Sequence, residues 1–383
     1  MTSEGKIRDV VIVGGGPAGS TLARELAAKG VDVLLLEKSK LPRNKTCAGG
    51  VTARAAALLP FDYSSVVEDT IYRARVSYRL ERHLVRDTNR PLTYTVSRDR
   101  FDHLLCQEAI RQGAEVRDGE KVTTVIQREG FVELSATSGE FSGRVVVGAD
   151  GPMSVVASSL RMKRHVRVHW GLQAEVRADH IQLAPWAGSV GLDFGRIPTG
   201  YTWLFPKWGH VSIGAGSPPH LARNLKRYVR EHVAAMGFSE IDVISMKGHC
   251  MPVRLGKGRI VEGRVLLLGD AAGLMDPFTG EGIYAAMRSA SLALPAVIRG
   301  LNFGPDILVE YQRSVDKELM PEAALAMGLS RLCALAPRMI YDRFDRDIRV
   351  WNAFCRLLRG ETTYSYLVSR MGLMKYVLKL SAL

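Results

Sequence analysis

A glycine-rich turn between two short apolar runs constrains the fold of this chain more than any other feature. Residues 9–13 and 31–37 read as strands, and residues 20–29 read as the helix that connects them. The turn itself, residues 14–19, has the sequence Gly-Gly-Gly-Pro-Ala-Gly. This order predicts a βαβ unit whose helix N-terminus binds the pyrophosphate of a dinucleotide.

Each residue type in the turn has a physical role in this prediction. Gly14 permits the sharp bend, Gly16 lets the backbone approach the pyrophosphate, and Gly19 allows the helix to pack closely on the strand. Pro17 and Ala18 complete the turn and are assigned to the cofactor site with it. The cofactor site therefore begins at this turn.

An acidic residue ends the second strand. Glu37 lies 23 residues after Gly14, where a carboxylate can accept hydrogen bonds from the hydroxyls of an adenosine ribose. The same carboxylate disfavours a 2′-phosphate, and Lys38 beside it is assigned to the same site. Because NAD and FAD are bound by the same βαβ unit, this segment alone leaves both cofactors open.

Three later segments resemble, in order and content, those of the flavoprotein hydroxylase superfamily typified by para-hydroxybenzoate hydroxylase. The first is the R-x-x-F-D element that begins at Arg98, and the second is an apolar strand that runs into Gly148-Ala-Asp150-Gly151. The resemblance implies that Arg98 contacts the flavin nucleotide. It also implies that Asp150 and Gly151 lie near the FAD diphosphate and support the NAD(P)H site.

The third segment is an apolar strand that ends in Gly269-Asp270, followed by Gly280 and Gly282 at the start of a helix. An acid at a strand end can accept hydrogen bonds from ribityl hydroxyls, and glycines allow a helix N-terminus to face the N1–C2=O edge of the flavin. Together the three segments decide for FAD. Two more residues are assigned to the cofactor site, Val122 and Ile283.

Two further elements resemble those of the geranylgeranyl reductase family, which includes archaeal and plant polyprenyl reductases. The stretch Cys47-Ala48-Gly49-Gly50 matches the C-x-G-G element of that family, which lies against the isoalloxazine. Residues 200–207 match its Y-x-W-x-F-P-K element, which lines the substrate cavity. The resemblance assigns Cys47, Ala48 and Gly49 to the cofactor. It assigns four residues to the substrate: Tyr201, Trp203, Phe205 and Pro206.

The resemblance implies a reductase that saturates carbon–carbon double bonds of a polyprenyl chain by hydride transfer from reduced flavin N5. Aromatic faces would stabilise positive charge that develops on the tertiary carbon, and Tyr201 and Trp203 are the candidates. Cys47 is the third candidate catalytic residue, and it could deliver a proton, position a water or shape the cavity. The substrate head group stays open among a lipid, a diphosphate, a quinone and a pigment precursor.

Two other functions fit the same residues. An FAD-dependent monooxygenase acting on an aromatic or lipidic substrate needs mainly a cavity and control of oxygen. A flavoprotein could also carry a polyprenyl lipid without turnover. Because no second dinucleotide fingerprint occurs, the electron donor is left between NAD(P)H and ferredoxin, with a quinol also open.

At 383 residues the chain exceeds the usual size of one core, which predicts two connected domains and a terminal appendage. The superfamily resemblance implies an α/β fold with a Rossmann-like FAD-binding domain, an interleaved mixed-sheet substrate domain and a C-terminal helical cap. We expect the FAD-binding domain to comprise residues 1–70, 95–165 and 255–320, the substrate domain residues 71–94 and 166–254, and the cap residues 321–383. In the cap we expect helices over residues 321–334, 337–358 and 364–380.

The net charge of +13 fits nucleic acid, an anionic membrane surface or an anionic substrate. Because no recognised nucleic-acid fold signature accompanies the charge, we expect no nucleic-acid partner. The basic residues gather in two clusters: Arg73, Arg75, Arg79, Arg82, Arg86 and Arg90, and then Arg161, Lys163, Arg164 and Arg167.

The cysteines and the N-terminus bound the cellular setting. Five cysteines without a C-x-x-C pair argue against disulfides and structural zinc, so we expect a reducing compartment and no metal site. The N-terminal residues lack a secretory pattern, and no run of about 18 apolar residues occurs. We therefore expect a cytoplasmic protein, with peripheral contact at an anionic cytoplasmic membrane left open.

Overall fold

A mixed eight-stranded sheet forms one half of the protein, in a computed structural model that describes residues 6–256 and 258–370. Its central strands run parallel in the order β18-β11-β1-β2-β8. An antiparallel hairpin, β9 (Thr124–Gln127) and β10 (Val132–Ala136), pairs with the first residues of β11, and β17 (Val261–Glu262) pairs with β18 at the edge opposite β8. The parallel strands are β1 (Ile7–Val13), β2 (Val33–Glu37), β8 (Glu115–Asp118), β11 (Gly139–Gly148) and β18 (Val265–Leu267).

Parallel pairing brings the predicted cofactor segments to one edge of this sheet. Val13 at the end of β1 lies beside Leu36 of β2 and Gly148 of β11, and Gly148 lies beside Leu267 of β18. The glycine turn, Glu37, the segment after Gly148 and the segment after Leu267 therefore all leave the sheet at its carboxyl edge. In open α/β sheets this edge is where ligands bind.

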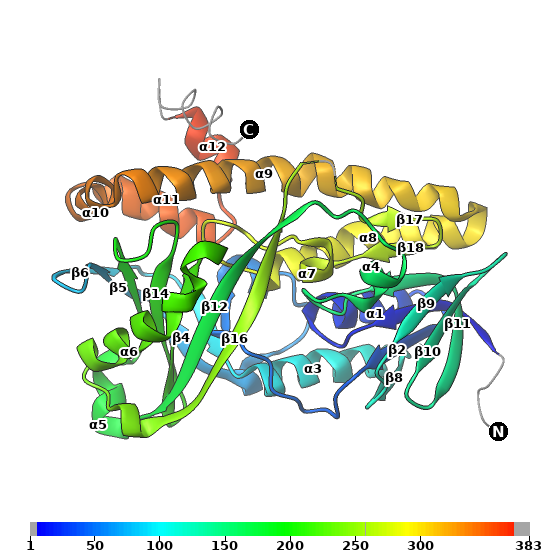
Figure 1. The fold of residues 1–383 in the computed structure, drawn as a ribbon, viewed down its shortest axis with the longest axis horizontal. Helices are drawn as coiled ribbons and strands as arrows, with labels where there is room; N and C mark the ends of the chain where they lie inside the picture. Colours follow the sequence, from blue (N-terminus) through cyan, green and yellow to red (C-terminus); the bar gives the residue numbers. More distant parts are fainter. Residues whose placement is uncertain (1–5, 257, 371–383) are drawn as a thin grey trace.

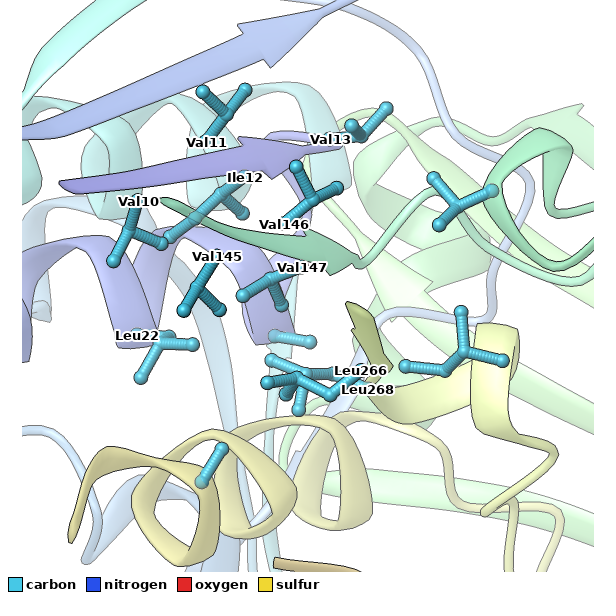
Figure 2. Close-up of a cluster of buried hydrophobic side chains, with 14 of the residues drawn as sticks. Val10, Val11, Ile12, Val13, Leu22, Val145, Val146, Val147, Leu266 and Leu268 are labelled. Atoms are coloured by element: carbon cyan, nitrogen blue, oxygen red, sulfur yellow. The ribbon is translucent and has the colours of Figure 1, made fainter. Parts of the chain in front are cut away.

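The core of this half lies between the sheet and two helices, and Figure 2 shows its alternating side chains. Val11 and Val146 point to one face of the sheet, while Val10, Val145 and Val147 point to the other. Both faces are buried, which explains the continuous apolar runs in these strands. The two helices are α1 (Pro17–Ala27) and α8 (Ile283–Phe303).

A second sheet of seven strands forms the other half, in the order β16-β12-β15-β14-β13-β5-β6 (Figure 1). Its strands come from two separate parts of the chain, residues 73–87 and 166–254. The domain boundaries themselves stay a prediction. The strands are β5 (Arg73–Tyr78), β6 (Arg82–Asp87), β12 (Val166–Arg177), β13 (Ser189–Phe194), β14 (Tyr201–Lys207), β15 (His210–Ser217) and β16 (Val243–Arg254).

A small three-stranded sheet lies between the two halves, and its strand β7 is followed in the chain by the helix α3 of the first half. It pairs β3 with β7 and β7 with β4. The helix α3 starts at Arg98, as the R-x-x-F-D element predicts. The elements are β3 (Gly50–Thr52), β4 (Val67–Ile71), β7 (Thr93–Val96) and α3 (Arg98–Arg111).

The C-terminal helices cross both halves, but their boundaries differ from the predicted ones. The helix expected to start at residue 321 is α9, which starts at Val309 and continues through Pro321. The single helix expected over residues 337–358 is wrong, because the chain leaves helical geometry at Asp347, whose carboxylate accepts from the Arg349 N–H and starts a new helix. The helices are α9 (Val309–Leu335), α10 (Pro337–Arg346), α11 (Ile348–Leu358) and α12 (Tyr364–Ser369).

The last expected helix, over residues 364–380, lies partly outside the described residues. Within the described chain, no single helix is long and apolar enough to cross a membrane. One helix pair, Pro305–Leu335 with Pro337–Arg346, meets the length and composition criterion when taken together, and it bends by 101° at its break.

Candidate active site

A cavity of about 800 Å³ lies between the carboxyl edge of the first sheet, the face of the second sheet and the C-terminal helices. It brings together most of the predicted site residues, although they span most of the chain. Three predicted residues, Gly19, Gly49 and Pro206, do not line it. Those that do are Gly14, Gly16, Pro17, Ala18, Glu37, Lys38, Cys47, Ala48, Arg98, Val122, Asp150, Gly151, Tyr201, Trp203, Phe205, Asp270, Gly280, Gly282 and Ile283.

The glycine turn forms a cradle with room for a phosphate. Gly14 has a φ of +107°, and a Cβ there would collide with the Ala149 backbone. Gly16 has ordinary extended geometry, and the nearest atom to a Cβ there is Arg43 Nη2 at 3.8 Å. Among the described side chains none caps the N-terminus of α1. The free N–H groups of the first turn therefore face open space that fits a diphosphate.

Gly19 has the packing role that the sequence predicts. A Cβ on Gly19 would collide with the carbonyl oxygen of Gly14 and would crowd Ile12. Because the obstructing atom is backbone, it cannot move aside as a flexible side chain can. Gly19 thus lets α1 pack closely against β1, although it does not line the cavity.

Backbone N–H groups of the glycine turn and of Ser39 hold the Glu37 side chain at the end of β2. Its carboxylate accepts from the Gly15 N–H at 2.9 Å and from the Ser39 N–H at 3.0 Å, and the side chain is buried. Arg43 lies beside it at 3.4 Å and also pairs with Asp102 at 2.8 Å. No sequence pattern points to Arg43, because the loop around it matches no motif.

Asp270, the acid of the third motif, lies near two cationic side chains in the cavity, Lys45 and Arg98. Burial raises the pKa of Asp270, while the charges of Lys45 and Arg98 oppose the rise. Burial lowers the pKa of Lys45, and the nearby Arg98 charge lowers it further. A Cβ on Gly282 would lie 3.5 Å from Asp270 Oδ1, so the acid stands at the N-terminus of α8, which no described side chain caps. This edge fits the ribityl chain and the pyrimidine side of a flavin.

Arg98 lies between Asp270, at the carboxyl edge of the first sheet, and the loop that carries Cys47. Its Nε donates to Asp102 at 2.7 Å, and its guanidinium lies within hydrogen-bonding reach of the Cys47 thiol. Gly49 has a φ of +76°, and a Cβ there would collide with Val96 O and Lys207 Nζ. Gly49 is therefore required by the loop's packing.

A buried amide holds the Cys47 loop from the second sheet. Gln173 Nε2 donates to the Cys47 carbonyl oxygen at 3.0 Å and also contacts the Glu175 carboxylate. Glu175 in turn accepts from Ser212 Oγ at 2.6 Å and lies 3.3 Å from His210 Nε2. No sequence pattern points to Gln173, because its partner is 126 residues away.

Aromatic side chains from one face of β14 form a wall of the cavity. The rings of Tyr201 and Trp203 lie 5.8 Å apart at 61°, and the Tyr201 hydroxyl donates to the Thr279 carbonyl oxygen. Trp203 Nε1 is buried and has no hydrogen-bond partner among the described residues. Pro206 instead lines a smaller cavity of about 380 Å³, which His180 also lines. Alternation along the strand explains the difference between Phe205 and Pro206.

The remaining lining divides into a polar part and an apolar arm. His249 of β16 lines the polar part, where burial and the charges of Lys45 and Arg98 lower its pKa to about 3. His249 could not be predicted as a site residue either, since a single histidine in a strand matches no motif. The apolar arm is lined by the C-terminal helices through Ala334, Pro337, Ile340, Tyr341, Phe344, Trp351, Phe354 and Leu358.

Comparisons with known proteins agree with this geometry. The FAD binding domain family matches residues 8–315. The chain is 30% identical over 344 residues to digeranylgeranylglycerophospholipid reductase 1 of Methanopyrus kandleri, covering 81% of this chain and 86% of that protein.

Two solved structures share the fold. A geranylgeranyl bacteriochlorophyll reductase-like protein from Thermoplasma acidophilum superposes with a TM-score of 0.75 at 24% identity, covering 86% of this chain and 88% of its own. A flavin-dependent brominase superposes with a TM-score of 0.74 at 21% identity, covering 93% and 94%. At these identities the two structures establish the α/β flavoprotein fold, as predicted.

Proposed function

The chain belongs to the FAD binding domain family and is an FAD-dependent oxidoreductase, and we propose that it saturates carbon–carbon double bonds of a polyprenyl chain. The chain could be carried by a lipid, a diphosphate, a quinone or a pigment precursor. One observation carries the proposal: a single cavity joins the cofactor edge, the Cys47 loop and an aromatic wall to a long apolar arm. The similarity to a digeranylgeranylglycerophospholipid reductase supports the same substrate class.

The residues at the sheet edge would hold FAD. The N–H groups at Gly16 would bind the diphosphate, Glu37 the adenosine ribose, and Asp270 the ribityl chain. Bound and reduced, the flavin supplies a hydride equivalent, which an electron donor such as NAD(P)H or ferredoxin must regenerate.

The apolar arm would bind and orient the hydrocarbon chain. Its lining from α10 and α11 carries no charged side chain among the described residues, so a polyprenyl tail would meet only apolar and aromatic surfaces there. Each buried methylene contributes about 0.8 kcal/mol to binding. The arm would also exclude water from the reacting bond.

The aromatic wall would stabilise the charge that develops when an isolated alkene is reduced. No carbonyl polarises such a bond, so its tertiary carbon takes on positive character as the hydride arrives. The faces of Tyr201 and Trp203 would contribute about 1–2 kcal/mol in a desolvated site. Because the Tyr201 hydroxyl donates to the carbonyl oxygen of Thr279, beside Gly280, the wall is held to the loop that precedes α8.

Cys47 would supply the proton that the second alkene carbon requires. Its thiol lies beside the Arg98 guanidinium, which can hold the negative charge left when the proton departs. Gln173 donates to the Cys47 carbonyl oxygen, so the backbone that carries the thiol is held in place. The hydride and the proton together add two hydrogens to each double bond.

The test is an anaerobic reaction followed by mass spectrometry. The purified holoenzyme, reduced with dithionite, is mixed with geranylgeranyl diphosphate or a geranylgeranylated lipid. Products heavier by steps of two hydrogens support the proposal. Unchanged lipid under these conditions, with oxygen incorporated on admission of air and NAD(P)H, would favour the monooxygenase. Lipid that stays bound and unchanged in both arms would favour a carrier.

A further inference from the structure

The bend between α9 and α10 lies at one end of the molecule (Figure 1), and apolar side chains near it are exposed. Leu335 at the end of α9 is 84% exposed, and Met339 in the first turns of α10 is 47% exposed. Ile348, which starts α11, is 56% exposed. Exposed residues of this size are costly in water when they gather in one segment. We call residues 335–349 the elbow.

Helix α10 has two faces with different surroundings. The inner face, at a spacing of three or four residues, carries Pro337, Ile340, Tyr341 and Phe344, which line the apolar arm of the cavity. Met339 lies between these positions and faces away from the cavity. The exposed side of the elbow is therefore separated from the arm by about one helix diameter, roughly 10 Å.

The outer side of the elbow also carries unneutralised positive charge. Arg338, Arg343 and Arg346 are exposed, and none of the three has an ion pair within the described parts of the chain. The three nearby aspartates already form ion pairs with other arginines. Arg82 lies 2.6 Å from Asp342, Arg86 lies 3.8 Å from Asp345, and Arg349 lies 3.0 Å from Asp347.

This combination distinguishes the elbow from another exposed apolar segment. Ile241 and Ile244 are 90% and 58% exposed, but they are flanked by Glu240 and Asp242, and of these two acids only Glu240 has an ion-pair partner in the described chain, Arg230 at 3.4 Å. Asp242 leaves a negative charge beside the two isoleucines, so an anionic surface would attract that segment less than the elbow. The same surface would attract the elbow, where arginines flank the apolar side chains, as in helices that lie in a membrane interface.

We infer that the elbow docks on an anionic lipid bilayer. Leu335, Met339 and Ile348 insert among the acyl chains, and Arg338, Arg343 and Arg346 contact the head groups. The inner face of α10 then lies about one helix diameter from the bilayer, so a polyprenyl chain passes from the membrane into the apolar arm over a short path. This last step rests on the proposed function, whereas the docking itself does not.

Vesicle flotation of the holoenzyme tests the docking. Vesicles of phosphatidylglycerol and phosphatidylcholine should carry the wild-type protein upward, and pure phosphatidylcholine vesicles should carry less. A triple variant, Leu335→Ser, Met339→Ser and Ile348→Ser, should lower the partition coefficient by about tenfold or more. The matched control, Ile241→Ser with Ile244→Ser, should float as the wild type does.

Two results would overturn the inference: a wild-type protein that stays at the bottom with anionic vesicles, or a triple variant that floats as well as the wild type. The flavin absorbance of each variant shows whether it is folded. Failure of the proposed function is distinguishable, since flotation requires no turnover. If the proposed function holds, the triple variant should reduce a short, water-soluble polyprenyl diphosphate normally and a vesicle-embedded polyprenyl lipid more slowly.

Discussion

Replacing Gly16 with alanine separates cofactor binding from folding. The backbone at Gly16 has a φ of −88° and a ψ of −176°, which any residue adopts without strain. The nearest atom to a new Cβ is the tip of a flexible arginine at 3.8 Å, so the apo protein has room for the methyl group. The methyl group would instead occupy the space where the diphosphate approaches the first turn of α1.

The magnitude follows from the hydrogen bonds that this approach allows. A hydrogen bond to a charged group contributes about 1.5–3 kcal/mol, and about 1.4 kcal/mol corresponds to a tenfold change in affinity. If the Cβ prevents one such bond, the dissociation constant for FAD should rise roughly 10- to 150-fold. The melting temperature of the apo protein should stay unchanged.

Titration of the apo protein with FAD, followed by flavin fluorescence, measures this change. Gly19→Ala is the matched comparison, because its Cβ would collide with the Gly14 carbonyl oxygen. Overpacking of this kind costs about 1–3 kcal/mol, so Gly19→Ala should lower the melting temperature of the apo protein. An unchanged FAD affinity in Gly16→Ala would refute the placement of the diphosphate at this turn.

Three further predictions concern two residues of the site and the pH dependence of folding stability at a buried histidine outside it, His232. Cys47→Ala should lower the turnover number at least 100-fold, as expected for loss of a general acid, and full turnover would remove Cys47 from the mechanism. Trp203→Leu should lower the turnover number about 5- to 30-fold, because about 1–2 kcal/mol of charge stabilisation is lost, while Trp203→Phe should retain most of the turnover number. Equal losses in the two variants would argue against charge stabilisation by the ring. Burial and the charge of Arg196 lower the pKa of His232 to about 3, below the usual 6.5, so the unfolded chain binds one more proton between these pH values. The free energy of unfolding should therefore fall by about 1.4 kcal/mol per pH unit as the pH drops through this window, and His232→Gln should flatten the slope in denaturant titrations.

The parts of the site that the sequence predicts are those in which local geometry demands one residue type. Gly14 has a positive φ against a neighbouring backbone, and Gly19 has a carbonyl oxygen in the way of any Cβ. Glu37 ends a strand that pairs in register with the strand before the turn. The bend at Gly14 and the packing of Gly19 against it lie within one short turn, so a short pattern records them.

The parts that the sequence does not predict depend on long-range contacts. Lys45 acquires its environment from Arg98 and Asp270, which come from other segments of the chain. His249 reaches the cavity only because β16 pairs with β12 across the second sheet. The break at Asp347 also escapes prediction, since the apolar periodicity continues through it.

The most direct test of the central claim is an anaerobic single-turnover experiment on the reduced holoenzyme. Geranylgeranyl diphosphate is mixed with the dithionite-reduced enzyme, free of excess reductant. The absorbance of oxidised flavin is recorded during the reaction, and the mass of the product is determined by mass spectrometry. The account predicts that absorbance returns without oxygen, with one double bond saturated for each flavin reoxidised. Flavin that stays reduced until oxygen is admitted, with the polyprenyl chain unchanged, would contradict it.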